Sequence, residues 1–338
     1  MCGTDGRGHE ESQGWRIQVK ISLITPAKKQ SKNGNRTTAL RWARMLREVG
    51  HRVHIDMDYG GETADLMIAI HAWRSADAIL HYRDCFPSGP LVVVLGGTDV
   101  NSFLKTHPET TLRSMKMADV LICLHDLIGE VLPVSFRKKL HVVRQSALPL
   151  PGPRRPAKRK FDICVIGHLR EEKDPFRAAL AARLLPPNSR VRVIQLGKAH
   201  TPDFASQAVA EMAVNPRYRW LGEVPGWRVR RELAKTRAMV ISSNQEGGAN
   251  VLSEAIVAGV PVIASDITGN VGLLGHDYPG TYPVRDEAAL ASLLYRCETD
   301  PAFLDTLEHF GRKLKPLFLP VHEKAALKRI VSWVARGE

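Results

Sequence analysis

The sequence lacks the features that mark membrane, disulfide-bonded and zinc-binding proteins. No apolar run approaches the roughly 20 residues that span a bilayer, and residues 1–16 are polar without the apolar core of a signal peptide. The five cysteines are scattered, odd in number and without CxxC spacing. We therefore expect a cytoplasmic protein without membrane contact, with a flexible extension at residues 1–16 and with no obligatory metal or cofactor.

Acidic and aromatic residues are also scarce. Lysine and arginine number 48 against 35 aspartates and glutamates, so the formal net charge is +13, while aromatic residues make up 6% of the chain. The densest basic run, at residues 154–160, lacks the interleaved aromatics of a single-strand nucleic-acid binder. The partners expected are therefore small-molecule substrates and neighbouring enzymes of one pathway, not nucleic acid.

Strand-like apolar runs alternate with helical periodicity along the chain, which is typical of parallel sheets built from βαβ units. A proline-rich segment at residues 148–160 predicts a linker between two domains. The expected fold class is α/β, with two Rossmann-like doubly wound domains at residues 17–150 and 151–317 that face an interdomain cleft. A last helix, at about residues 318–336, is expected to pack back on the first domain. The expected strands are 17–24, 53–57, 66–70, 91–95, 120–124, 140–143, 161–166, 190–196, 218–221, 238–243 and 261–264.

The clearest motif is EGGANVLSEAIVAGVPVIAS at residues 246–265. Gly247 and Gly248 follow an expected strand, and Ala249 and Asn250 open a helix. Free backbone N–H groups and the positive end of the helix dipole favour an anion at such a turn, and glycines let a diphosphate approach. For the glycine pair alone, an ordinary buried turn is the simpler interpretation.

The same stretch carries two carboxylates, Glu246 in the turn and Glu254 about two turns into the helix. Each can accept hydrogen bonds from sugar hydroxyls at either end of a diphosphate. The spacing E-x7-E followed by AxxAGVPVIAS resembles the donor-binding motif of GT-B glycosyltransferases, the glycogen-synthase-like group that uses nucleotide sugars. The resemblance implies the GT-B fold, with Glu246 on the transferred sugar and Glu254 on the ribose.

A second segment, GHLREEK at residues 167–173, resembles the GRLxxxK pattern with which that family clamps the diphosphate. The resemblance implies that Lys173 stabilises the charge on the leaving group; a surface lysine on a charged loop is the alternative. His168 stands beside Gly167 where the family usually has arginine, and Arg170 is the candidate replacement. The family's base pocket would be lined by Trp220, Leu221 and Gly222, although a tryptophan there is also typical of a core.

The loop after the first expected strand, TPAKKQSKNGNR, is rich in hydrogen-bond donors. Its cationic and amide side chains, a glycine and the helix N-terminus that follows predict a pocket for a small tetrahedral anion. A solvated basic loop explains the charge equally well. The candidate acceptor-binding residues are Lys28, Lys32, Asn33, Gly34, Asn35 and Arg36.

Further candidates follow three other strand ends, which face the same cleft. His71 and Asp99 are candidates for a general base, although a lone histidine near a strand end is more often structural. The remaining acceptor candidates are Arg74, Thr98, Gln145 and Ser146.

Over roughly residues 19–320 the chain resembles the selenosugar synthases of the selenoneine pathway, in stretches such as IGHLREEKDPFRAA, NPRYRWLGE and GLLGHDYPGTYPV. The resemblance implies transfer of a sugar from UDP-N-acetylglucosamine (UDP-GlcNAc) or UDP-glucose to selenophosphate, with a new carbon–selenium bond and release of UDP and phosphate. Selenophosphate is a small tetrahedral anion, which suits the basic loop. The alternatives are a glycosyltransferase with a hydroxyl acceptor, such as a lipid or polysaccharide, and a non-catalytic sugar-nucleotide-binding module.

Overall fold

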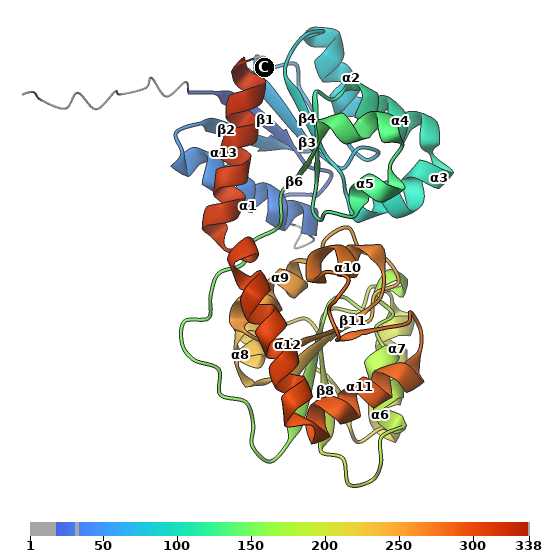
Figure 1. The fold of residues 1–338 in the computed structure, drawn as a ribbon. Coiled ribbons are helices and arrows are strands. Elements are labelled where there is room, and N and C mark those ends of the chain that lie inside the picture. The colour runs from blue at the N-terminus through green and yellow to red at the C-terminus, as the bar shows by residue number, and fades with distance from the viewer. Residues whose placement is uncertain (1–17, 31–33, 337–338) are drawn as a thin grey trace, which may run out of the picture.

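The computed structural model describes residues 18–30 and 34–336, which form two α/β domains, one above the other in Figure 1. The predicted extension at residues 1–16 and the candidates Lys32 and Asn33 lie outside the described residues. Within the described ranges, no helix is long and apolar enough to cross a bilayer.

The first domain is built on a sheet of six parallel strands in the order β2-β1-β3-β4-β5-β6. Central strands such as LMIAI and LVVV are buried along their whole length, as expected for a parallel sheet with both faces covered. The strands are β1 (Lys20–Ile24), β2 (Arg52–Asp56), β3 (Leu66–Ile70), β4 (Leu91–Val94), β5 (Val120–Cys123) and β6 (Leu140–Val142). The helical segments are α1 (Gly34–Glu48), α2 (Ala76–Cys85), the π-helix η1 (Asp99–Phe103), α3 (Leu104–Thr106), α4 (Pro108–Met117), α5 (Ile128–Val131) and η2 (Val134–Lys139).

The second domain repeats this plan with the strand order β12-β11-β10-β7-β8-β9. Its strands are β7 (Phe161–Ile166), β8 (Val191–Leu196), β9 (Tyr218–Trp220), β10 (Ala238–Ile241), β11 (Val262–Ser265) and β12 (Thr281–Tyr282). Its helical segments are η3 (Glu171–Lys173), α6 (Arg177–Arg183), α7 (Pro202–Val214), α8 (Gly226–Lys235), α9 (Asn250–Ala258), α10 (Thr268–Leu274), α11 (Glu287–Thr299), α12 (Pro301–Leu314) and η4 (Lys315–Phe318). The two parallel sheets confirm the predicted α/β fold class.

The strand predictions differ from the structure mainly at the ends. β10 stops at Ile241, two residues before the predicted end, and β1 starts at Lys20 instead of residue 17, which lies outside the described ranges. The predictions missed β12, because two residues make too short an apolar run to be seen. Strand ends are set by the neighbouring strand and not by local composition, so such differences are ordinary.

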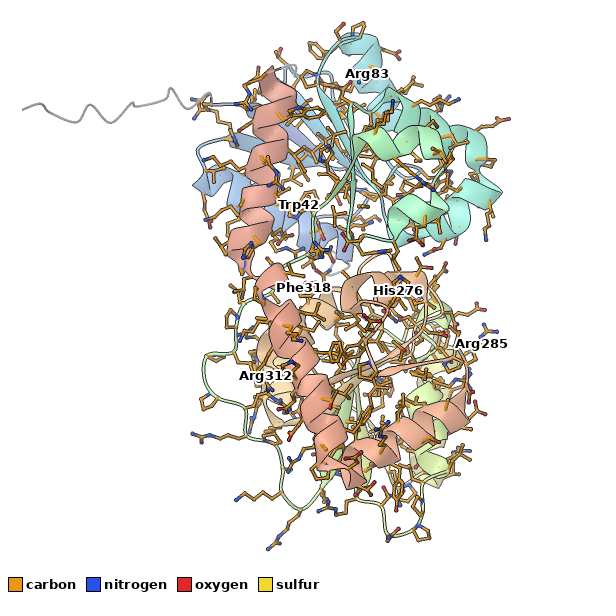
Figure 2. The ribbon with its side chains drawn as sticks, in the orientation of Figure 1. Trp42, Arg83, His276, Arg285, Arg312 and Phe318 are labelled. Carbon is orange, nitrogen blue, oxygen red and sulfur yellow. The ribbon has the colours of Figure 1, made fainter. Side chains whose placement is uncertain are left out.

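The chain passes between the domains twice. Residues 143–160 contain no helix or strand. The second passage follows η4: Phe318 is buried in the second domain's core, whereas the next helix, α13 (Pro320–Arg336), lies on the first domain beside α1 (Figures 1 and 2). α13 buries Leu327, Ile330, Val331 and Val334 in the same core as α1 and β1.

Both passages meet at one buried carboxylate, Glu323 in the first turn of α13. It accepts hydrogen bonds from Trp42 Nε1 at 2.7 Å and from Ser146 N at 2.9 Å, and it also pairs with Ser146 Oγ. Arg41 Nε lies 3.0 Å from Glu323 Oε2 and donates to Glu323 Oε1 at 3.1 Å, and Arg41 Nη1 donates to Asn250 Oδ1 at 3.1 Å. Asn250 is the first residue of α9. This network therefore links the first domain to the helix that follows Glu246, Gly247 and Gly248, which we call the EGG loop.

Candidate active site between the two domains

The loop that follows β4 in the first domain touches the EGG loop that follows β10 in the second. A Cβ added at Gly97 would lie 2.7 Å from Gly247 Cα, and one at Gly247 would collide with Gly97 N. Gly248 has a φ of +142°, and a Cβ there would lie 2.6 Å from Leu124 Cβ. Packing therefore explains why glycine stands at positions 247 and 248, because the first domain fills the space that larger side chains would need.

The structure brings Lys173 and Glu246 together although 73 residues separate them. Lys173 ends η3 after β7, and its Nζ forms an ion pair with Glu246 Oε1. Ser243 Oγ donates a hydrogen bond of 2.6 Å to the same oxygen. Only 21% of the lysine side chain and 10% of the glutamate side chain are exposed, so this pair is a partly desolvated charge cluster beside the start of α9. A cation and a carboxylate in this place can contact a diphosphate and a sugar hydroxyl respectively.

Glu254 lies in the second turn of α9. Burial raises the pKa of its carboxyl, while the positive charges of Arg41 and Arg230 oppose that rise. Its carboxylate has no hydrogen-bond partner among the described residues. The group can therefore accept hydrogen bonds from a ligand without losing an internal contact.

The residues predicted to bind the base gather around Gly197 at the end of β8. Trp220 Nε1 donates to Gly197 O at 2.8 Å, and Gly197 N donates to Gly222 O at 2.8 Å, with Leu221 between the two. Gly167 packs against Gly197 so closely that a Cβ at Gly197 would collide with the Gly167 carbonyl. The indole of Trp220 is half-buried and packs against the second domain's core.

His168 is directed toward the loop after β8. Its Nδ1 accepts a hydrogen bond from Lys198 N at 3.3 Å. Burial, and then the positive charge of Arg170, lower the pKa of His168. The imidazole is therefore neutral at pH 7 and does not supply the charge of the arginine that the GRLxxxK pattern has at this position.

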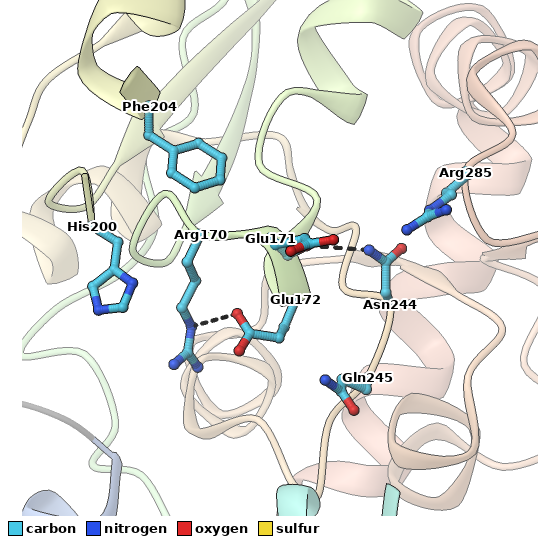
Figure 3. A pocket seen from close by; sticks show the side chains of 8 residues that line it. All are labelled: Arg170, Glu171, Glu172, His200, Phe204, Asn244, Gln245 and Arg285. Atoms are coloured by element: carbon cyan, nitrogen blue, oxygen red, sulfur yellow. Dashed lines mark hydrogen bonds and ion pairs between the residues drawn. The ribbon is translucent and has the colours of Figure 1, made fainter. Parts of the chain in front are cut away.

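Arg170 lies in a neighbouring cavity and not in the Lys173 and Glu246 cluster. Its Nε lies 3.8 Å from Glu172 Oε2. Figure 3 shows this cavity between the loops that follow β7, β8, β10 and β12, with His200 and Arg285 at opposite sides of the view. The cavity measures about 530 Å³ and is lined by Arg170, Glu171, Glu172, His200, Phe204, Asn244, Gln245 and Arg285.

In the first domain, side-chain contacts connect three of the predicted residues, Asp99, His71 and Thr98, in one chain. His71 Nδ1 lies 2.7 Å from Asp99 Oδ1, and His71 Nε2 lies 2.7 Å from Thr98 Oγ1. His71 and Asp99 are buried, whereas Thr98 is half-buried. Arg74 is exposed on the following turn, with its guanidinium 5.9 Å from the centre of the Phe103 ring.

The other acceptor candidates separate into two groups. Gly34, Asn35 and Arg36 begin α1, and a Cβ at Gly34 would lie 3.7 Å from Asn250 Nδ2 across the domain contact. Lys28 is exposed in the loop before them. Gln145 and Ser146 are buried and hold internal partners, since Gln145 Nε2 donates to Thr38 Oγ1 of α1 at 2.7 Å and Ser146 binds Glu323.

Sequence reasoning missed His125, which follows β5 at the same edge of the sheet. The residue is fully buried, and neither ring nitrogen has a hydrogen-bond partner among the described residues. A Cβ at Gly272 of α10 would lie 2.7 Å from His125 Cγ, so the ring packs directly on the second domain. Burial lowers its pKa to about 4. Its place after a strand end was the one signal available in the sequence.

The chain is similar to known proteins in both domains. Residues 152–314 match the family described as glycosyl transferases group 1. The second domain therefore resembles the group 1 glycosyltransferases. Glycosyltransferase 1 domain-containing protein 1 from Xenopus tropicalis is 24% identical to this chain over 272 residues, which cover 73% of this chain and 79% of the relative.

Solved structures resemble this protein over both domains. HepE from Anabaena, crystallised with UDP, superposes with a TM-score of 0.75 at 15% identity, covering 93% of this chain and 99% of HepE. Sucrose-phosphate synthase from Thermosynechococcus elongatus superposes with a TM-score of 0.76 at 17% identity, covering 94% of this chain and 99% of the synthase. The fold is GT-B, as the motif in α9 predicts.

Proposed function

We propose that this protein transfers a sugar from UDP-GlcNAc or UDP-glucose to selenophosphate, forming a carbon–selenium bond and releasing UDP and phosphate. The observation that carries the proposal is the Lys173 and Glu246 pair beside the N-terminus of α9, opposite the start of α1 in the first domain. In this proposal the donor would bind on one side of the domain contact and the acceptor on the other.

The donor half of the proposal rests on the second domain. The diphosphate would lie at the N-terminus of α9, where free N–H groups and the helix dipole favour negative charge. Lys173 would stabilise the charge that grows on the leaving UDP, while Glu246 would bind the transferred sugar and Glu254 the ribose. HepE, which was crystallised with UDP, supports UDP as the nucleotide.

The acceptor half rests on the first domain. Lys28, Asn35 and Arg36, near the positive end of α1, supply the donors and the charge that a small tetrahedral anion needs. Selenophosphate presents selenium as an anionic and soft nucleophile, so positioning matters more than deprotonation. Selenium would attack the anomeric carbon as the bond from that carbon to the diphosphate oxygen breaks, and the electron pair would leave with UDP.

The proposal is tested by UDP release from UDP-GlcNAc and UDP-glucose with selenophosphate, thiophosphate, phosphate or no acceptor, with mass spectrometry of the products. We expect UDP release with selenophosphate and a product in which selenium is attached to the sugar. If UDP is released only with lipid or polysaccharide hydroxyls, the protein is an ordinary glycosyltransferase and the proposal fails. If UDP-sugars bind without turnover under any acceptor, the protein is a binding module.

A further inference from the structure

Asp99, His71 and Thr98 form a hydrogen-bonded chain whose proton positions follow from the carboxylate. Asp99 is fully buried, and its two oxygens accept from Ala72 N at 2.9 Å, Trp73 N at 2.9 Å and Gly96 N at 2.8 Å. With these three N–H donors the carboxylate is held as an acceptor, so the 2.7 Å contact with His71 Nδ1 requires a proton on that nitrogen. His71 Nε2 is then the acceptor, and the Thr98 hydroxyl donates to it at 2.7 Å.

The backbone is shaped around the imidazole ring. His71 has a φ of +81°, a conformation that costs a non-glycine residue on the order of 1 kcal/mol and that collects at functional sites. A Cβ at Gly96 would lie 3.0 Å from His71 Cδ2, so a larger residue there would press on the ring. The N–H of Arg74 is also directed at Nδ1, at 3.2 Å, but the shorter contact of Nδ1 with the Asp99 carboxylate decides the tautomer.

The chain ends at the domain contact and not in the interior of the first domain. Thr98 is half-buried and follows Gly97, which touches Gly247 of the EGG loop. The π-helix η1 starts at the next residue, and it binds the same loop through Asn101 Nδ2, which donates to Glu246 O at 3.3 Å. Single π-turns are frequent at functional sites. The polarised hydroxyl therefore lies beside the backbone that carries Glu246.

We propose that Thr98, activated by His71 and Asp99, is the nucleophile that removes the phosphoryl group from selenium after the carbon–selenium bond has formed; this rests on the proposed function. Hydroxyl, imidazole and carboxylate in this order are the arrangement of nucleophilic catalysis. The proposed function leaves this task open, because the transferred selenium carries its phosphate until a second step breaks the selenium–phosphorus bond.

The step balances without any further reagent except water. Thr98 Oγ attacks phosphorus and gives its proton to His71 Nε2, while the selenium–phosphorus bond breaks and its electron pair leaves on selenium. The imidazolium then protonates the selenolate. In the second half, water attacks the phosphothreonine, His71 takes a proton from that water, and the proton returns to Thr98 Oγ as phosphate leaves. Asp99 keeps the ring oriented and stabilises its charged form.

The test uses a substrate that needs no transfer step, a glucosyl thiophosphate in which sulfur joins the anomeric carbon to phosphorus. We expect the full-length protein to release phosphate from it in the presence of UDP. Thr98→Val should slow this release by about 100-fold or more, Thr98→Ser should restore much of it because the hydroxyl returns, and Thr299→Val, an exposed threonine on α11, should leave it unchanged.

The outcomes separate this inference from the proposed function. No phosphate release by the wild-type protein, or equal release by Thr98→Val and wild type, overturns the inference even if UDP is released from UDP-sugar and selenophosphate. Phosphate release that depends on Thr98, together with no UDP release from UDP-sugar and selenophosphate, supports the inference and refutes the proposed transfer. Phosphothreonine at position 98, found by mass spectrometry after rapid quenching, would support the covalent step directly.

Discussion

Glu323→Gln should destabilise the protein far more than one lost hydrogen bond would suggest. The carboxylate is fully buried and accepts from Trp42 Nε1, Ser146 N and Ser146 Oγ, with Arg41 Nε 3.0 Å away. A glutamine has one acceptor oxygen, so its NH₂ group would face donors, and Arg41 would lose its counter-charge. Removing one partner of a buried ion pair costs about 3–5 kcal/mol. Because the amide oxygen keeps some of the contacts, we expect about 3 kcal/mol.

A matched control exists on the same two helices. Glu48 of α1 and Lys324 of α13 form an ion pair of 3.1 Å, but 47% and 38% of these side chains are exposed. Solvent screens such a pair, so Glu48→Gln should cost less than about 1 kcal/mol. The two substitutions remove the same charge from the same helix contact and differ in burial.

The assay is urea denaturation followed by tryptophan fluorescence, with the double variant Glu323→Leu and Arg41→Leu completing the comparison. The double variant should recover part of the loss, since it leaves no unpaired charge. Because Arg41 also binds Asn250, Glu323→Gln should weaken donor binding as well, measured by UDP titration. Equal shifts in the urea midpoint for Glu323→Gln and Glu48→Gln would refute the reasoning.

Three further predictions concern the domain contact. Lys173→Ala should lower turnover by about 100-fold while changing UDP-sugar affinity much less, because leaving-group charge grows in the transition state; equal losses in kcat and affinity, from steady-state kinetics and titration, would contradict this role. Gly97→Ala should push the EGG loop away from the first domain, since the added Cβ would lie 2.7 Å from Gly247 Cα. Small-angle scattering should then show a larger radius of gyration. An unchanged radius together with full turnover would count against this contact. The pKa of His125 lies at about 4, below its ordinary value near 6.5. The unfolded chain therefore takes up this proton first, and up to about 3 kcal/mol of stability should be lost as pH falls from about 6.5 to 4; urea midpoints that fall equally for wild type and His125→Gln would exclude this cause.

The local pattern of the sequence was enough to predict every strand of the described residues except β12. Apolar runs of strand length and the period of Ala39, Trp42, Ala43 and Leu46 depend on neighbours along the chain, and these four residues are all fully buried. β12 escaped prediction because a two-residue strand forms only when another strand is beside it. The role of Gly247 was also only partly predictable, since the backbone that it touches belongs to the other domain.

The sequence by itself determined two α/β halves and a GT-B donor motif, because alternating strands and helices, the EGG turn and the spacing of Glu246 and Glu254 are local features. Only the tertiary structure decided which side chains meet. It paired Lys173 with Glu246, joined Thr98, His71 and Asp99 in one chain, and placed Ser146 on Glu323. Such contacts depend on how strand ends are positioned across two sheets, and no spacing along a chain encodes that distance.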